Sequence, residues 1–268
     1  MTAEPIRDSG AAATAQAFVS ARLAARATPE YPGVLPVTMA DGYVIQEIAI
    51  GLYPDEIIGW KVGGVPPPRQ AELGIHRLAG PIFARNRFTV DGDITVQAIE
   101  GGFCAVEAEF IARIGAGVDP AKTDWTVEEA TAAIDAVFIG IEIAGSPLSA
   151  INDLGPPIVA SDFGNNAGLF VGLELADWRD GLDAIEVETT IDGVSVGTGG
   201  APSLQGGAME SVRFLLEHCA RRGRPLTEGT LVSTGAVTGV HRIHAGSDFT
   251  CDFRGVGVIK GVTVPATA

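Results

Sequence analysis

Residues 103–112 read Phe103-Cys104-Ala105-Val106-Glu107-Ala108-Glu109-Phe110-Ile111-Ala112, and they carry the clearest structural signal in the chain. Apolar residues alternate here with two glutamates, which is the period of a β-strand. Because residues two apart on a strand share one face, Glu107 and Glu109 are expected to lie side by side. Neighbouring carboxylates repel each other unless a cation or a shared proton lies between them. The segment therefore predicts a strand that carries a metal or proton site, with an ordinary solvated strand face as the alternative.

A second apolar run, residues 136–144, adds a third carboxylate. It reads Ala136-Val137-Phe138-Ile139-Gly140-Ile141-Glu142-Ile143-Ala144, which is typical of a strand buried on both faces. Glu142 is its only charged residue, and a buried carboxylate without a partner costs much free energy. Three carboxylates without a His or Cys partner suit a hard cation, Mg2+ or Mn2+ before Zn2+. The two runs together therefore predict a metal site of Glu107, Glu109 and Glu142.

The composition of the 268-residue chain predicts a folded, soluble protein with a substantial core. Hydrophobic residues make up 46% of the chain and charged residues 19%, a balance typical of globular proteins. The 18 basic and 33 acidic residues leave a formal charge of −15, which argues against binding to phosphates or anionic lipid. No segment approaches the roughly 20 apolar residues of a membrane-spanning helix. We therefore expect neither nucleic acid nor a membrane as a partner.

The N-terminal segment and the cysteines both favour a cytoplasmic location. Arg22 and Arg26 interrupt the alanine-rich runs near the N-terminus, so these runs are not typical of a secretory signal. The three cysteines, Cys104, Cys219 and Cys251, are widely spaced and lack the spacing of a metal site. Such cysteines indicate free thiols in a reducing compartment.

Pattern changes divide the chain into a helical N-terminal region, residues 1–57, and a β-rich body, residues 58–268. The Gly/Pro-dense residues 63–68 cannot form the interior of a helix or of a central strand. We therefore expect a loop there that leads into a mobile lid near residues 64–80.

Turn and capping signals place several elements in this frame. Asp192-Gly193 between two strand-like runs predicts a β-hairpin. Thr126 begins a capping box for a short helix that is expected to end near Val137. Further helices are expected at residues 11–27, 38–52 and 208–222, and strands at residues 230–234, 248–253 and 256–264.

Lys61 is a candidate active-site cation. It lies at the end of the strand-like run Ile58-Gly59-Trp60-Lys61-Val62-Gly63, just before the Gly/Pro loop. A lysine beside a low-dielectric pocket can bind a carboxylate, or its pKa can shift enough for it to exchange protons. A solvent-facing lysine is the alternative.

Four motifs follow one another along the chain: Gly59-Trp60-Lys61-Val62-Gly63, Val106-Glu107-Ala108-Glu109, Ile141-Glu142-Ile143 and Asn165-Asn166-Ala167-Gly168-Leu169-Phe170. Their residues and their order resemble the fumarylacetoacetate hydrolase superfamily. Within it the chain is similar to the branch of 2-oxopent-4-enoate hydratases and 4-oxalocrotonate decarboxylases of aromatic catabolism. The resemblance extends to Gly257, and Leu231-Val232-Ser233-Thr234-Gly235 makes it more specific.

The resemblance implies an α+β fold, a β-rich roll of mixed sheets with a small helical N-terminal part. It implies a divalent metal, Mg2+ or Mn2+, held by Glu107, Glu109 and Glu142. It also implies a lyase, either a hydratase or a decarboxylase, whose substrate is a 2-oxo or 2-hydroxydienoic acid. Relatives are commonly oligomeric, and the apolar surface of the two N-terminal helices also favours self-association, so we expect a homo-oligomer.

Three residues are implied as contacts of this substrate. Lys61 matches the active-site lysine of the family. Asn166 lies in the fourth motif, and Thr234 lies in the C-terminal segment that borders the pocket in the family.

The chain departs from the family at Phe83-Ala84-Arg85-Asn86, where an acidic pair is expected. An acid that could move protons is missing there, which argues against standard hydratase activity. Arg85 could instead clamp a second carboxylate on a dicarboxylic substrate. An exposed loop arginine is the alternative.

Two other functions stay open beside the lyase. Glu72 and His76 lie four apart, so they would share one face of a helical lid and could activate water in a C–C bond hydrolase. Gly74 between them weakens such a helix, and a surface histidine is the alternative. The chain could also be a non-catalytic subunit that holds a metal and a keto acid.

Overall fold

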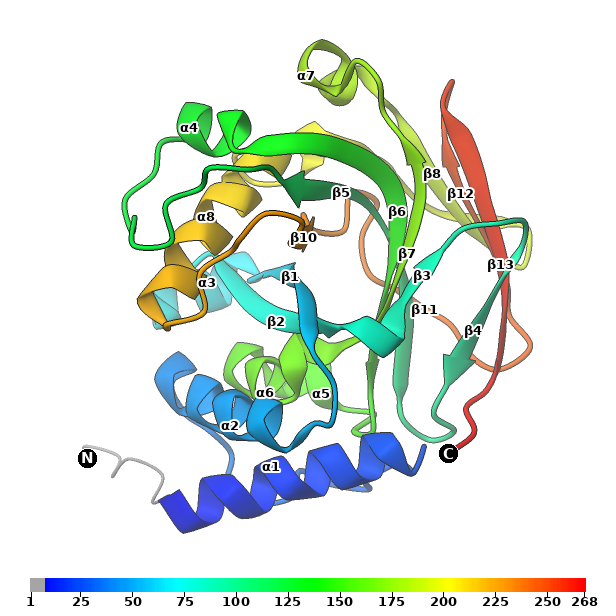
Figure 1. Ribbon diagram of the computed structural model, residues 1–268. Helices are drawn as coiled ribbons and strands as arrows, with labels where there is room; N and C mark the ends of the chain where they lie inside the picture. The colour runs from blue at the N-terminus through cyan, green and yellow to red at the C-terminus, as the bar shows by residue number, and fades with distance from the viewer. Residues whose placement is uncertain (1–7) are drawn as a thin grey trace.

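Two curved sheets form the centre of the computed structural model, which describes residues 8–268 (Figure 1). The eight-stranded sheet contains β1 (Ile57–Gly64), β2 (Arg77–Phe83), β3 (Arg87–Thr89), β5 (Phe103–Ile114), β6 (Ile134–Ser146), β7 (Asn166–Glu174), β10 (Leu231–Ser233) and β11 (His241–Arg242). The five-stranded sheet contains β4 (Ile94–Ala98), β8 (Val187–Ile191), β9 (Val194–Gly199), β12 (Asp248–Phe253) and β13 (Gly257–Pro265).

The strand order is mixed in both sheets. The larger sheet runs β2-β1-β10-β5-β6-β7-β3, with β11 also paired to β5, and the smaller runs β4-β13-β12-β8-β9. Parallel pairs, such as β1 with β10 and β13 with β4, occur beside antiparallel pairs such as β5 with β6. The predicted α+β fold with a β-rich roll of mixed sheets is therefore confirmed.

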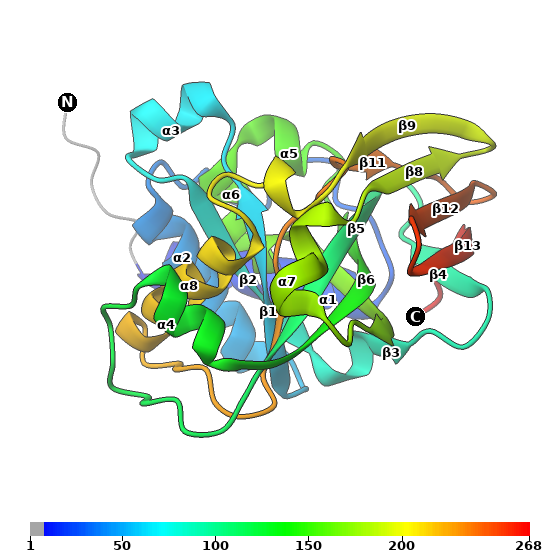
Figure 2. The ribbon, with the colours of Figure 1, turned by 90° about the horizontal axis from the view of Figure 1, so that it is seen from above.

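The helices cover the sheets from several sides. Figure 1 shows α1 and α2 together at one end of the larger sheet, and Figure 2 shows α4 and α8 side by side, away from the smaller sheet. The helices are α1 (Asp8–Leu23), α2 (Met39–Leu52), α3 (Pro67–Leu73), α4 (Val127–Ala132), α5 (Ile151–Leu154), α6 (Pro156–Ser161), α7 (Trp178–Gly181) and α8 (Ala208–Arg221). No helix within residues 8–268 is long and apolar enough to cross a lipid bilayer.

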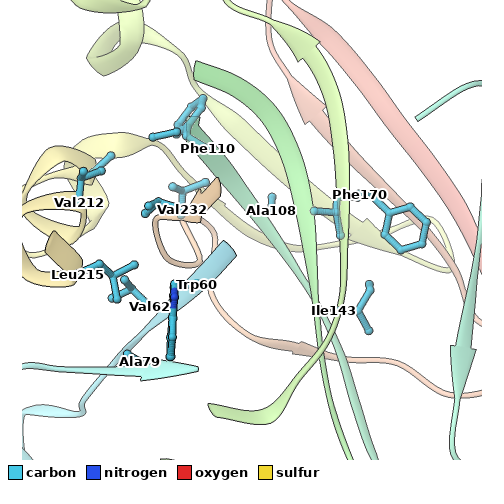
Figure 3. Close-up of a cluster of buried hydrophobic side chains, with 14 of the residues drawn as sticks. Trp60, Val62, Ala79, Ala108, Phe110, Ile143, Phe170, Val212, Leu215 and Val232 are labelled. Carbon is cyan, nitrogen blue, oxygen red and sulfur yellow. The ribbon is translucent and has the colours of Figure 1, made fainter. Parts of the chain in front are cut away.

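The core beneath α8 explains which face of β1 each side chain points to. Trp60 and Val62 of β1 lie in a buried cluster with Val212 and Leu215 of α8 and Val232 of β10 (Figure 3). Successive residues of a strand point to opposite faces. Burial of Trp60 and Val62 on this side therefore turns the residue between them toward the other side of the strand.

Two helix boundaries differ from the expectation. The first helix ends at Leu23 rather than residue 27, and Ala25 beyond it has a left-handed φ of 47°. The helix that begins after Thr126 ends at Ala132 rather than near Val137, so that prediction was wrong. The residues beyond it start β6, because their apolar side chains are buried in pairing with β5.

The hairpin and the other predicted elements agree with the structure. Asp192 and Gly193 both have positive φ, 50° and 76°, as the tight turn between β8 and β9 requires. Thr38 and Asp41 form a reciprocal capping box at the start of α2. The helix expected at 208–222 corresponds to α8, and the three predicted C-terminal strands correspond to β10, β12 and β13.

The segment expected as a lid, residues 64–80, contains a helix and the start of a strand, and its mobility stays a prediction. Helix α3 occupies Pro67–Leu73, whereas residues 77–80 belong to β2 and pair with β1. This pairing fixes the last four residues of the segment in the sheet. The division of the chain at residue 57 stays a prediction, and its first seven residues lie outside the described part.

Candidate metal and substrate site

Three buried carboxylates meet on the larger sheet. Glu107 of β5 pairs directly with Glu142 of β6, and Glu109 follows two residues along β5 on the same face. One ligand atom from each of the three residues lies within 4.8 Å of the others. The exposed fraction is 4% for Glu107 and 0% for Glu109 and Glu142. The solvated strand face considered from the sequence is therefore not what this strand presents.

Lys61 of β1 completes the cluster. Its Nζ lies 3.1 Å from Glu142 Oε2 and donates a hydrogen bond to Asn165 Oδ1 at 3.2 Å. The side chain is 3% exposed, because it lies on the face of β1 opposite Trp60 and Val62. The lysine is therefore buried against a carboxylate rather than facing solvent.

The cluster carries an unbalanced charge. Burial raises the pKa of Glu107 to about 7, although Lys61 lowers it. Burial and the neighbouring Glu142 and Glu107 raise the pKa of Glu109 well above its ordinary value. Burial alone would lower the pKa of Lys61, but the attraction of Glu142, Glu107 and Glu109 outweighs it and raises that pKa. Three carboxylates and one ammonium, when ionised, leave two negative charges, which one divalent cation would neutralise.

The hydrogen bonds of the carboxylates test whether a cation fits. Glu109 Oε2 accepts from Ser233 Oγ at 2.5 Å and from the Gly235 N–H at 2.8 Å. Glu109 Oε1 is buried, and no donor among residues 8–268 reaches it. Glu142 Oε1 accepts from Asn166 Nδ2 at 2.9 Å. A buried carboxylate oxygen without a donor, beside two more carboxylates, fits a hard divalent cation that binds oxygen ligands.

A cavity of about 670 Å³ opens beside this cluster. Lys61 and Glu107 lie in its wall, and α3 and the segment of α5 and α6 contribute to the rest. Its volume is in the range of small-molecule sites. The polar and charged side chains in the wall are Lys61, Arg69, Gln70, His76, Arg77, Glu107, Asn152, Asp153, Asn165, Ser203, Gln205, Ser211 and Thr234.

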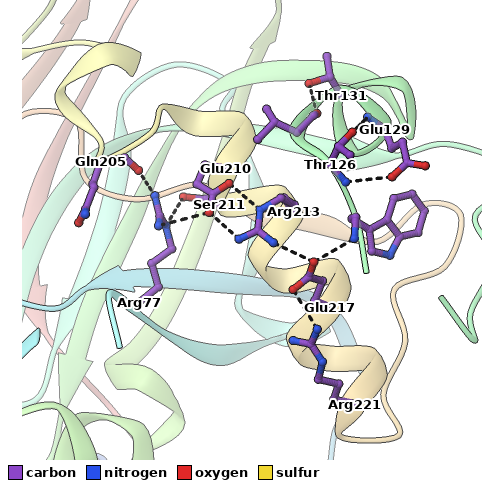
Figure 4. Close-up of polar contacts among 12 residues, drawn as sticks. Arg77, Thr126, Glu129, Thr131, Gln205, Glu210, Ser211, Arg213, Glu217 and Arg221 are labelled. Atoms are coloured by element: carbon purple, nitrogen blue, oxygen red, sulfur yellow. Dashed lines mark hydrogen bonds and ion pairs between the residues drawn. The ribbon is translucent and has the colours of Figure 1, made fainter. Parts of the chain in front are cut away.

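Arg77 in this wall is tied to α8. It donates to the backbone oxygen of Gln205 and to Ser211 Oγ, and it lies 3.9 Å from Glu210 Oε1 (Figure 4). Burial lowers its pKa, although Glu210 raises it. These contacts hold the start of β2 against α8 at the edge of the cavity.

The two asparagines of the fourth motif have different positions. Asn165 lies in the cavity wall and bonds Lys61, whereas Asn166 is absent from the wall and supports Glu142 from behind. The motif contains both residues, but the one that lines the cavity is Asn165 and not Asn166, the residue that the sequence predicted. Thr234 lies in the wall, but its hydroxyl donates to the backbone oxygen of Phe110 at 2.8 Å.

Glu72 and His76 do not form the expected pair. Helix α3 ends at Leu73, and Gly74 after it has a left-handed φ of 66°, so the two residues do not share a helix face. Glu72 Oε2 lies 2.5 Å from Arg69 Nη1 and is not part of the cavity wall. His76 does lie in the wall, where its Nδ1 is 2.8 Å from Gln70 Oε1.

Arg85 lies outside the cavity. Its guanidinium is 3.7 Å from Asp55 Oδ2 and 5.6 Å from the centre of the Tyr53 ring, and its side chain is 48% exposed. The clamp for a second carboxylate is therefore not formed by this residue in the structure. The side chain is instead a surface arginine, because the short helical turn that carries it packs beside the end of α2.

Several residues of the site escaped the sequence interpretation. Ser233 and Gly235 flank Thr234 in a motif that was noticed, but their bonds to Glu109 depend on which strand lies beside β5. Asn165 has a left-handed φ of 57°, a conformation that asparagine tolerates better than most residues. An asparagine pair before a strand was the available signal for such a turn.

Comparisons with known proteins agree with this fold and site. No protein-family model matches the chain. A 2-keto-4-pentenoate hydratase of Paraburkholderia xenovorans is 26% identical over 95% of the chain and 93% of the relative. A 4-oxalocrotonate decarboxylase of a Pseudomonas species is 23% identical over 92% of the chain and 95% of the relative.

Solved structures share the fold. The 4-oxalocrotonate decarboxylase of Pseudomonas putida G7, complexed with magnesium and adipate, has a TM-score of 0.81 at 20% identity, covering 98% of this chain and 100% of that one. A fumarylpyruvate hydrolase of Pseudomonas aeruginosa, in complex with Mn2+ and pyruvate, has a TM-score of 0.55 at 16% identity over 77% and 89% of the two chains.

The resemblance found in the sequence is thus confirmed: the sequence relatives are named as a hydratase and a decarboxylase, the branch that the motifs indicated. The chain also shares its fold with two members of the fumarylacetoacetate hydrolase superfamily, the 4-oxalocrotonate decarboxylase and the fumarylpyruvate hydrolase.

Proposed function

We propose that this protein is a divalent-metal-dependent lyase that acts on a 2-oxo or 2-hydroxydienoic acid, as a hydratase or as a decarboxylase. The observation that carries the proposal is the buried cluster of three carboxylates and Lys61 in the wall of a cavity. The relatives that match the chain over most of its length are named for these two reactions. Hydration and decarboxylation are both lyase reactions, so the proposal of a lyase holds whichever of the two the protein catalyses.

Glu107, Glu109 and Glu142 would hold the cation, with Mg2+ or Mn2+ as the proposed ions. The bound cation supplies Lewis-acid chemistry, which withdraws electrons from the 2-oxygen of the substrate. Asn166 and Ser233 orient the carboxylates through their hydrogen bonds to Glu142 and Glu109. Such supporting bonds are a common feature of metal sites, because they fix the ligand before the cation arrives.

Lys61 has two possible tasks in the reaction. Its ammonium can bind the carboxylate of the substrate, and its Nζ can hold or give the proton that a substrate carbon exchanges. Glu142 and Asn165 fix the position of Nζ at 3.1 and 3.2 Å. Burial in the cavity wall limits the access of water, which strengthens each of these contacts.

The geometry favours the lyase over the hydrolase alternative. That alternative needs Glu72 beside His76, whereas Glu72 pairs with Arg69 away from the cavity wall. A C–C bond hydrolase would therefore have to use His76 without this partner.

A panel assay tests the proposal. The Mg2+-loaded protein is incubated with 2-hydroxydienoates, 2-oxo-enedioates and acylpyruvates, and products are identified by mass. Gain of water or loss of CO2 is the expected result, and it also separates the two lyase reactions. Cleavage to pyruvate and an acid would contradict the lyase and support the hydrolase, and tight binding without turnover would support a non-catalytic subunit.

Metal analysis tests the ligand set separately. Glu142→Gln removes one negative charge at nearly constant shape, so we expect it to lose most bound Mg2+ or Mn2+ after dialysis. Glu186→Gln is the matched control, because the Glu186 side chain is 72% exposed and pairs with Arg254 at the surface. Full metal occupancy in Glu142→Gln would exclude Glu142 from the ligand set.

Three finer expectations stay predictions. They are the cytoplasmic location, the homo-oligomeric assembly and a role in aromatic catabolism.

A further inference from the structure

We propose that Arg22 of helix α1 is a positioning residue for Lys61. It holds a strained turn, residues 162–166, which carries Asn165 to the ammonium of Lys61 and Asn166 to Glu142. The inference rests on the proposed function, because it assigns a task to α1 within the same site. It gives the N-terminal helix a role in the chemistry of the β-rich body.

The turn has an unusual backbone conformation at three successive residues. Phe163, Gly164 and Asn165 have φ of 55°, 61° and 57°, all in the left-handed region. Two of the three carry a Cβ, for which this region is unfavourable. Strain of this kind persists only where the surrounding structure over-determines it, and it gathers at functional sites. The turn therefore needs external contacts to stay in place.

Arg22 supplies such contacts at both ends of the turn. Its Nε and Nη2 bind Asp162 Oδ1 and Oδ2 at 2.6 and 2.9 Å, and its Nη1 donates to the backbone oxygen of Asn166 at 2.9 Å. Its Nη2 also donates to the backbone oxygen of Gly145 at 2.8 Å, three residues after Glu142 on β6. The side chains of Arg22 and Asp162 are 9% and 0% exposed, so both charges depend on this pairing.

The turn lies directly against β2, the strand that pairs with the Lys61 strand β1. Gly80 of β2 is the register partner of Lys61, and a Cβ at Gly80 would collide with the backbone oxygen of Phe163. Asn165 is held on its other side as well, because its Nδ2 donates to Asn152 Oδ1 at 2.9 Å. This leaves Asn165 Oδ1 directed at Lys61 Nζ, 3.2 Å away. A shift of the turn would move the partner of the ammonium.

The shape of arginine suits this task better than its charge alone. Its planar fork binds both carboxylate oxygens of Asp162 and still reaches three backbone oxygens, which the single ammonium of a lysine cannot do. Arg22→Lys therefore keeps the charge and loses the fork. Because small displacements at a reacting group are costly, the effect is expected at Lys61 as well as in stability.

The test is a double-mutant cycle between Arg22 and Lys61, read by the binding of oxalate at saturating Mg2+. We expect Arg22→Lys to weaken oxalate binding about tenfold, the scale of a lost supporting contact at a metal site. In the Lys61→Met background the same change should alter oxalate binding less than about threefold, because the group being positioned is gone. Arg179→Ala is the control, since Arg179 binds a backbone oxygen and stacks on Trp178 outside the cavity wall.

Chemical rescue gives a second readout. Guanidinium ion added to Arg22→Ala should restore part of the oxalate affinity, and it should not do so for Arg179→Ala. If the Arg22 variants do not fold, Ser146→Ala replaces them, because Ser146 Oγ donates to Asp162 Oδ2 at 2.6 Å and its loss is a milder change. A loss of oxalate affinity that occurs with Ser146→Ala only when Lys61 is present supports the proposal too.

Other outcomes overturn the inference in distinguishable ways. An equal loss of oxalate affinity with and without Lys61 would make Arg22 a structural residue only, and no loss at all would exclude it. A wild-type protein that neither binds oxalate with Mg2+ nor turns over any 2-oxo acid would instead defeat the proposed function, and the inference with it.

Discussion

The carboxylate cluster and helix α3 contribute to the same cavity, but they are built in opposite ways. Lys61, Glu107, Glu109 and Glu142 are at most 4% exposed and lie on three strands of one sheet, β1, β5 and β6. Helix α3 buries none of its side chains, and its ion pair of Arg69 and Glu72 is 42% and 57% exposed. Reacting charges must be fixed and removed from water, whereas the opposite part of a cavity must admit a substrate. The difference predicts a preformed reaction centre beside an adaptable entrance.

Removal of Lys61 should have the largest effect. Lys61→Met is expected to lower turnover by about a hundredfold to a thousandfold, because it removes the group that we propose binds the substrate or moves its proton. Affinity for Mg2+ should stay the same or increase, since the three carboxylates lose a competing positive charge. Kinetics and equilibrium dialysis measure the two effects, with the exposed Lys260→Met as the control. Unchanged turnover would mean that the buried cluster is only structural.

Stability should differ sharply between the two regions. Phe110→Ala on β5 should lower the free energy of unfolding by about 3–5 kcal/mol, because Phe110 is fully buried and packs on Phe253. Leu73→Ala on α3 should cost clearly less, because Leu73 is only half-buried. Urea unfolding measures both variants. Equal losses would show that α3 is as firmly packed as the sheet.

His218 is buried without a carboxylate partner among residues 8–268, so its pKa shifts in the direction opposite to that of Lys61. Burial, with help from Arg222 and Arg221, lowers the pKa of His218 on α8 to about 4. The folded pKa lies below the unfolded value, so the unfolded chain binds more protons, and this contribution to stability is lost as pH falls from about 6.5 to 4. The loss amounts to about 3 kcal/mol at most.

Urea unfolding between pH 7 and pH 4 checks this prediction. His218→Gln should flatten the pH dependence in that window, while the exposed His244→Gln should leave it unchanged. An unaltered slope in His218→Gln would assign the pH dependence to other groups.

The ion pair on α3 should have the smallest effect on stability. Glu72→Gln should change the free energy of unfolding by less than about 1 kcal/mol, because exposed ion pairs contribute little. Its effect should appear in KM rather than in kcat, since freeing Arg69 changes the cavity wall and leaves Lys61 in place. Thermal unfolding and steady-state kinetics measure the two quantities. A fall in kcat as large as the one expected for Lys61→Met would instead support Glu72 as a reacting group.

Local patterns in the sequence were sufficient for the carboxylates and the sheet around them. Alternation along residues 103–112 placed Glu107 and Glu109 on one face, and the apolar run around Glu142 marked a buried strand. These predictions succeeded because strand periodicity and burial are properties of consecutive residues. The helix expected to reach Val137 failed, because pairing with β5 overrode the local signal after Ala132.

The partners of these residues were decided only by the tertiary structure. Arg22, Asn165 and Ser233 reach the site from α1, a strained turn and β10, and no spacing along the chain relates them to Glu109 or Lys61. The separation of Glu72 from His76 and the surface position of Arg85 likewise follow from packing. The sequence by itself determined that Glu107 and Glu109 share one strand face and that Glu142 lies in an apolar strand, because periodicity and apolar runs are properties of consecutive residues. Which partners they have depends on distant segments brought together by the fold, and a linear pattern contains no such distances.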